Sequence, residues 1–178
     1  MQSIHTIRFN NNVYHNGSHF TLLLYEHNGV AVAIPLPNSD LMSFVRVFNN
    51  IIECRNHIET NLQKLVTLFG YDDNIRHWLS SVDNIPPNLA EIKIFCPAED
   101  RLFATSWTRR YRKRFENITF DIINFEELNY RLLLFGIDHL KQLHSDFQPD
   151  SPELQQLVLD YKRVCHALAN YFWWEANR

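Results

Sequence analysis

The densest group of residues that could do chemistry is a basic run, Arg109-Arg110-Tyr111-Arg112-Lys113-Arg114. Guanidinium and ammonium groups hold phosphates through charge-assisted hydrogen bonds, so the run could bind a phosphate group or a nucleic acid. The alternative is a solvated helix face, because basic residues near a helix C-terminus complement the helix dipole. The candidate binding residues of this basic patch are Arg101, Arg109, Arg110, Arg112 and Lys113.

Two further residues suggest a small α/β enzyme with its site near Cys96 and Asp121. Cys96 ends a predicted strand and precedes a predicted helix, a position that can lower the pKa of a thiol. Glu99 and Asp100 act in the opposite direction, and a buried core thiol is the alternative interpretation. Asp121 lies in the next predicted strand, where a partly buried carboxylate needs a partner. The nearest candidate partner is an arginine of the preceding helix.

Several common chemistries have no motif in the sequence. Nine histidines occur, but their spacing matches no zinc-binding helix, so no metal is expected. No glycine-rich phosphate loop or dinucleotide fingerprint follows a predicted strand, and no serine nucleophile elbow is present. We therefore predict no catalytic set and no cofactor.

The end of the chain is the second candidate binding surface. Residues 152–174 carry apolar side chains at spacings of three and four, and Ser151-Pro152-Glu153 is a strong helix start. The helix reaches two adjacent tryptophans without a breaker, so it is either packed in the domain or docks on something outside it. We expect a protein partner or self-association, with the predicted interface formed by Leu168, Tyr171, Phe172, Trp173 and Trp174.

Residues 91–124 are the unit around which the rest is organised, and a further helix extends the pattern to residue 147. Alternating apolar residues predict a strand over 92–96, Pro97 starts a helix, residues 118–124 predict a second strand, and 126–147 another helix. Two strands joined through a helix form a parallel crossover. The order strand, helix, strand, helix resembles half of a receiver-type or TIR-type flavodoxin-like domain. This resemblance is one of element order, so it implies a fold and no activity.

The first part of the chain is expected to look different. Two Asn-Gly pairs, Asn16-Gly17 and Asn28-Gly29, separate apolar runs and predict a three-stranded antiparallel meander over residues 3–36. A helical period over residues 40–69, with Gly70 as its stop, predicts the longest helix. Residues 73–82 predict a short helix.

Composition limits the class of protein. The 178 residues are 46% hydrophobic and carry a net charge of -3, so the chain can bury a core, and nucleic-acid binding would need a local patch. Three cysteines far apart in the sequence, and no apolar run of membrane-spanning length, predict a soluble, cytoplasmic protein. We expect one globular domain, 1–178, with a soft boundary near 83–90 between segments 1–82 and 91–178.

These observations predict an α/β or α+β fold: a meander, a long helix, a βαβα unit with parallel strands, and a C-terminal amphipathic helix. Because no catalytic set is assembled, the leading hypothesis is a non-enzymatic protein-interaction or regulatory domain, a module of a larger intracellular protein and an oligomer. The alternatives are phosphate or nucleic-acid binding through helix 101–114, and the enzyme near Cys96 and Asp121. No membrane partner is expected.

Overall fold

The computed structural model of the protein describes residues 2–26 and 33–178. The fold is α/β, with a five-stranded, all-parallel sheet in the order β4-β2-β5-β6-β7. Numbered along the chain, the strands of this sheet have the order 2-1-3-4-5 of a doubly wound, flavodoxin-like sheet. A second, two-residue antiparallel pair joins β1 to β3.

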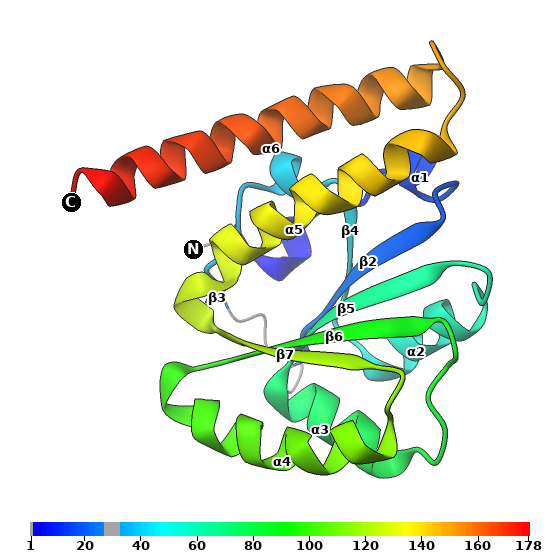
Figure 1. Ribbon diagram of the computed structural model, residues 1–178, viewed down its shortest axis with the longest axis vertical. Helices are drawn as coiled ribbons and strands as arrows, with labels where there is room; N and C mark the ends of the chain where they lie inside the picture. Colours follow the sequence, from blue (N-terminus) through cyan, green and yellow to red (C-terminus); the bar gives the residue numbers. More distant parts are fainter. Residues whose placement is uncertain (1, 27–32) are drawn as a thin grey trace.

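The elements alternate along most of the chain (Figure 1). The strands are β1 (Gln2–Ser3), β2 (His19–Leu24), β3 (Ala33–Ile34), β4 (Val45–Phe48), β5 (Leu65–Tyr71), β6 (Leu89–Cys96) and β7 (Thr119–Asn124). The α-helices of the described residues are α1 (Asn11–Tyr14), α2 (Ile51–Glu59), α3 (Asp72–Ser81), α4 (Arg101–Arg114), α5 (Leu128–Leu143) and α6 (Pro152–Ala176). The 3₁₀ turns are η1 (Ile4–Thr6), η2 (Ser39–Met42), η3 (Ala98–Asp100), η4 (Phe125–Glu127) and η5 (His144–Asp146).

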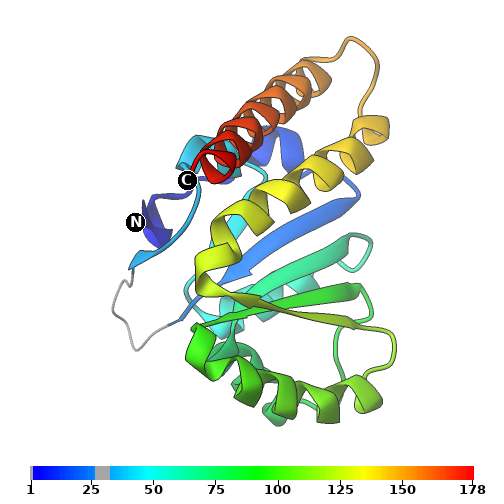
Figure 2. The ribbon, with the colours of Figure 1, turned by 60° about the vertical axis from the view of Figure 1, so that its left-hand side comes forward.

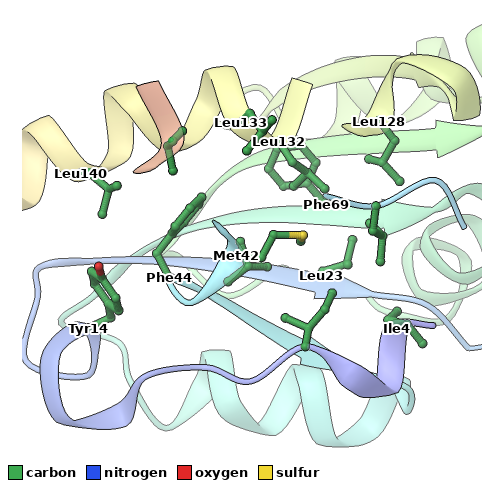
Figure 3. Packing of buried hydrophobic residues seen from close by; sticks show 14 of the residues in the cluster. Ile4, Tyr14, Leu23, Met42, Phe44, Phe69, Leu128, Leu132, Leu133 and Leu140 are labelled. Atoms are coloured by element: carbon green, nitrogen blue, oxygen red, sulfur yellow. The ribbon is translucent and has the colours of Figure 1, made fainter. Parts of the chain in front are cut away.

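Helices cover both faces of the sheet. Helices α2, α3 and α4 lie on one face, and α5 with α6 outside it lies on the other (Figures 1 and 2). Along the central strand β2, Leu22 and Leu24 belong to the core under α2–α4, and Leu23 belongs to the core under α5. Figure 3 shows the second core, where Phe44, Phe69 and Leu132 meet between the sheet and α5. A parallel sheet covered on both faces has apolar side chains on both, which is what these strands carry.

The predicted N-terminal meander is wrong. His19–Leu24 is the strand β2 at the centre of the parallel sheet, and residues 4–14 form η1 and α1 rather than strands. The turn predicted at Asn16-Gly17 is present, but it joins a helix to a strand. The second predicted turn, His27 to Val30, lies outside the described residues. β2 is buried on both faces of the sheet. It pairs in parallel with β4 and β5, which come later in the chain.

The predicted helix over residues 40–69 is also wrong, because that stretch holds η2, β4, α2 and β5. Apolar residues of four different elements happen to fall at helical spacings. Asn50 separates two of these elements, since its side chain caps α2 by accepting a hydrogen bond from the Glu53 N–H, 3.0 Å away. Gly70 ends no helix but lies inside β5.

The second half of the chain matches the predicted order of elements. β6, α4 and β7 form a parallel crossover, α5 follows, and the Ser151 side chain caps α6 by accepting from the Leu154 N–H at 3.1 Å. The boundary predicted near 83–90 is the connection from α3 to β6. Because β5 and β6 are hydrogen-bonded neighbours, the segments on its two sides share one sheet. The single-domain organisation stays a prediction.

Candidate functional site

One side of helix α6 packs against the core under α5. Leu157, Val164 and Leu168 are buried against the core under α5, and Asp160 is buried beside them. Leu168 was predicted as an interface residue, and the structure places it in the core. Tyr171, also predicted there, is half-buried and stacks on Tyr130 of α5 with ring centroids 5.2 Å apart. These contacts fix α6 along α5 up to its last turns.

The last turns of α6 carry three exposed aromatic residues. Phe172, Trp173 and Trp174 are 49%, 59% and 67% exposed, and we name these three residues the aromatic tip. The rings of Trp173 and Trp174 pack edge to face, with centroids 5.0 Å apart. Figure 1 shows this end of α6 reaching past α5. The tip therefore presents a large apolar surface to solvent at the end of an anchored helix.

The side of α6 that faces away from the core continues from the tip toward the middle of the helix. Its residues recur at alternating spacings of three and four, which is the spacing of a helix seam that contacts another helix. All of them are exposed, and we name the set the outer stripe: Leu159, Lys162, His166, Ala169, Trp173 and Ala176.

The predicted basic patch on α4 divides into two groups. Two of its arginines serve the structure: Arg101 donates to the Ile122 carbonyl at 3.3 Å and to the Asn124 side chain at 3.0 Å, and Arg112 donates to the Phe120 carbonyl at 3.2 Å. Both therefore hold α4 on the edge strand β7.

The second group of the basic patch is exposed. Arg109, Arg110 and Lys113 form no hydrogen bond or ion pair with any residue that the structure describes. The aromatic residues beside the patch face inward: Trp107 is buried in the core under α2–α4, and Tyr111 packs against that core. The patch thus offers cations without an adjacent stacking surface, and its binding role stays a prediction.

Cys96 lies at the end of β6 with none of its side chain exposed, in the core under α2–α4. Burial, followed by the nearby carboxylates of Asp72 and Asp100, raises the pKa of the thiol to about 11. The thiolate, which is the nucleophilic form, is therefore scarce at neutral pH.

Asp121 lies on the opposite face of the sheet from Cys96, so the two residues share no site. Its carboxylate pairs with Arg131 of α5 and lies 3.5 Å from the Lys93 ammonium. The prediction that an arginine of the preceding helix, α4, pairs with Asp121 is wrong. The register of β6 and β7 places Lys93 opposite Asp121, and α5 covers that face.

A third surface, which the sequence analysis missed, lies between α2 and α3 at the edge of the sheet where the strands end. The residues that matter there are Glu26, directly after β2, and Trp78 in α3. The predicted meander placed Glu26 beside a hairpin turn, far from Trp78. The available signal was the polar triplet Asp72-Asp73-Asn74, which follows the buried strand β5 and marks a strand end.

Residues 2–26 and 33–178 contain no group of three His, Cys, Asp or Glu side chains arranged to hold a metal ion. The described helices include none with the length and apolar character that crossing a membrane requires. Comparison with protein-family models, with curated protein sequences and with solved structures finds no match to the chain.

Proposed function

We propose that the protein is a non-enzymatic interaction domain that associates with a second copy of itself through the outer stripe and the aromatic tip of α6. The observation that carries the proposal is the exposure of Phe172, Trp173 and Trp174 on a helix whose other side is buried in the core. Monomeric proteins rarely expose contiguous aromatic surface of this kind, because its transfer out of water is favourable.

The order of residues along the outer stripe favours an antiparallel pair of helices. Lys162, a cation, and the imidazole of His166 lie in the middle of the stripe, and the indole of Trp173 lies near its end. Pairing two copies in opposite directions about Ala169 places the aromatic tip of each copy over Lys162 and His166 of the other. Cations over indole faces are attractive, whereas a parallel pair would place Lys162 beside Lys162. The small side chain of Ala169 lets the helices approach closely at their crossing.

The size of the surface predicts a weak complex. An aromatic side chain buries about 150–250 Å² when fully covered, so the half-exposed tip supplies roughly 300–400 Å² per copy. The total of roughly 600–800 Å² for both copies is below the ~1,200 Å² of a standard stable interface. We therefore expect a reversible, concentration-dependent dimer rather than an obligate one.

Sedimentation velocity of the whole chain across a concentration series tests the proposal. We expect the average mass to rise from monomer toward dimer, and the paired change Trp173→Ser with Trp174→Ser to leave a monomer at every concentration. The matched control is Leu102→Ser with Phe103→Ser, which removes exposed apolar side chains of α4 that are 84% and 52% exposed. This control should dimerise like the unmodified chain.

The antiparallel geometry has its own test. In a Cys165→Ser background, Ala169→Cys should form a disulfide-linked dimer under mild oxidation, because two copies of residue 169 meet at the crossing. Lys162→Cys in the same background should not, since residue 162 faces the far end of the other helix. An unmodified chain that stays monomeric at the highest concentration, or a tip variant that dimerises normally, would contradict the proposal.

A second candidate function is phosphate or nucleic-acid binding through α4. It is favoured by three cations, Arg109, Arg110 and Lys113, that pair with no residue the structure describes. Replacing all three by glutamine should remove binding of a labelled oligonucleotide together with its salt dependence. The control, Arg8→Gln with Lys141→Gln, changes exposed cations outside α4 and outside the outer stripe, and it should leave binding unchanged. Binding that survives the triple change would exclude this candidate.

A further inference from the structure

A crevice lies between α2 and α3 at the edge of the sheet where the parallel strands end. A cavity of about 510 Å³ is lined by Glu26, Tyr71, Asn74 and His77 together with neighbouring residues of α3. A second cavity of about 260 Å³ is lined by Trp78 and Ser81 and shares Glu26 and His77 with the first. The shared residues make the two cavities parts of one crevice.

The crevice occupies the position where open parallel sheets bind ligands. From β2 the chain crosses to β4 on one side, and from β5 it crosses to β6 on the other, so the sheet order reverses between β2 and β5. Ligands of doubly wound folds bind outside the strand ends at such a reversal. Glu26 follows β2 and Tyr71 ends β5, so the reversal lies at this crevice.

Glu26 is held in position by contacts on both of its sides. Its side-chain Oε2 accepts a hydrogen bond from the Ile51 N–H at the start of α2, at 2.9 Å. The Asn74 side chain clamps its backbone, accepting from the Glu26 N–H at 3.0 Å and donating to the Glu26 carbonyl at 2.8 Å. The second carboxylate oxygen, Oε1, has no hydrogen-bond donor or cationic partner among the residues that the structure describes. A half-buried, positioned carboxylate therefore lines the crevice, and no described residue pairs with its second oxygen.

Trp78 supplies the second, independent observation. Its side chain is 1% exposed, and its indole Nε1–H has no hydrogen-bond acceptor within the described part of the chain. An unpaired buried donor destabilises the folded protein, so such groups usually have a partner. Because Trp78 lines the smaller cavity, an oxygen atom of a bound molecule could accept this hydrogen bond.

The surrounding charge selects against phosphates. Each helical segment that starts at this edge of the sheet has carboxylates in its first turn: Glu53 in α2, Asp72 and Asp73 in α3, Glu99 and Asp100 in η3, and Glu126 and Glu127 in η4. These groups occupy the positive ends of the helix dipoles that would otherwise attract an anion. Two arginines line the crevice, and both are already paired: Arg76 of the larger cavity with Asp73 at 2.9 Å, and Arg55 of the smaller cavity with Glu59 at 2.8 Å.

We propose that the crevice binds a small organic cation, an ammonium or guanidinium group with an oxygen acceptor a few bonds away, such as an amino amide. The cation lies against Oε1 of Glu26, and its oxygen accepts the hydrogen bond from Trp78. A phosphorylated ligand does not suit this site. The proposal is independent of the self-association through α6, which lies on the other face of the sheet (Figure 2).

The probe for the first experiment is L-argininamide, followed through the tryptophan indole N–H signals of ¹⁵N-labelled protein. The chain has four tryptophans, so four signals are expected, and the signal lost in Trp78→Phe is that of Trp78. We expect argininamide to shift the Trp78 signal saturably, and Glu26→Gln to weaken binding about tenfold or more. The matched control is Glu53→Gln, which removes an exposed carboxylate in the first turn of α2, the turn that Glu26 contacts. It should weaken binding far less.

Two further probes separate the alternatives. Acetamide, which has the oxygen and no cation, should bind much more weakly, and adenosine monophosphate should not shift the Trp78 signal. A Trp78 signal that argininamide leaves in place would overturn the proposal. So would equal affinity in Glu26→Gln and the unmodified chain, or tighter binding of the nucleotide than of argininamide.

Discussion

Tyr14 and Asp160 lie 146 residues apart in the chain, and the phenolic hydroxyl of Tyr14 donates a hydrogen bond to the Asp160 carboxylate. Both residues are buried, at 1% and 3% exposed. Ser43 donates to the same carboxylate oxygen at 3.1 Å, and the Gln156 amide donates to the other at 3.0 Å. Asp160 thereby joins α6 to α1 and to the segment after η2, which fixes the helix that carries the aromatic tip.

The first prediction concerns this buried carboxylate. Tyr14→Phe removes the phenolic donor and leaves Asp160 less well satisfied, so we expect the free energy of unfolding to fall by about 1–3 kcal/mol. Urea denaturation measures the change. Tyr161→Phe on α6 is the matched control, since its hydroxyl makes no hydrogen bond to the residues described, and it should cost less than about 0.5 kcal/mol. Equal losses in the two variants would contradict the assigned role of Asp160.

The second prediction concerns Gly70 in β5. A Cβ at this position would lie 2.3 Å from Cδ1 of Ile75, closer than two carbon atoms can pack. Gly70→Ala should therefore destabilise the protein by about 1–3 kcal/mol through overpacking. In an Ile75→Ala background the obstructing atoms are gone, and the same change should cost little or stabilise the strand. A double-mutant cycle by urea denaturation measures this coupling, and additive effects would show that close packing against Ile75 is not the reason for a glycine.

The second half of the chain could be predicted because its signals are local. Pro97 with Glu99 and Asp100 marks the start of one helical segment, and Ser151-Pro152 marks another, and both lie at the predicted places. Each strand there is followed by the helix that covers it. Local spacing also predicted that an apolar helix ends in the aromatic residues 172–174, because this pattern involves no other element of the chain.

In the first half, the short helix predicted at 73–82 is present as α3, but the sheet could not be predicted because its strands depend on distant partners. Thr21, Leu22, Leu23 and Leu24 are all buried, and a run without alternation indicates a strand covered on both faces, but it does not say which strands lie beside it. The crevice was missed as a consequence. Glu26 and Trp78 are brought together by the position of β2 beside β5, and no spacing in the sequence encodes that neighbourhood.

The third prediction uses the three cysteines to test the enzyme hypothesis. Cys54 and Cys96 are fully buried with raised thiol pKa values, whereas Cys165 on α6 is half-exposed. In the folded protein, a thiol reagent should modify Cys165 first, and the other two only as the protein unfolds. Mass spectrometry of peptides after timed labelling measures the order, and Cys165→Ser should abolish the fast phase. Rapid labelling of Cys96 in the native state would instead support a role for Cys96 as a nucleophile.

The fourth prediction concerns the acid sensitivity of the fold, which follows from His139 in α5. Its side chain is 2% exposed, its Nε2 has no hydrogen-bond partner in the described structure, and its ring packs against Phe44 and Phe135. Burial, followed by the charge of His19, lowers the pKa of His139 from 6.5 to about 3. Below pH 6.5 the unfolded chain binds a proton that the folded chain does not. The stability contributed by the neutral ring is therefore complete above pH 6.5 and is lost as the pH falls toward 3, by at most about 1.4 kcal/mol per pH unit.

Urea denaturation at pH 7, 6 and 5 measures this slope in matched variants. His139→Leu removes the titrating group, so its free energy of unfolding should depend less steeply on pH than that of the unmodified chain. His144→Gln is the control, because His144 is exposed on the turn after the same helix and should leave the slope unchanged. His57, whose pKa burial lowers to about 4, contributes a slope of the same sign to both proteins. The difference between the His139 variant and the unmodified chain therefore isolates His139, and parallel pH profiles would show that this histidine is not buried in its neutral form.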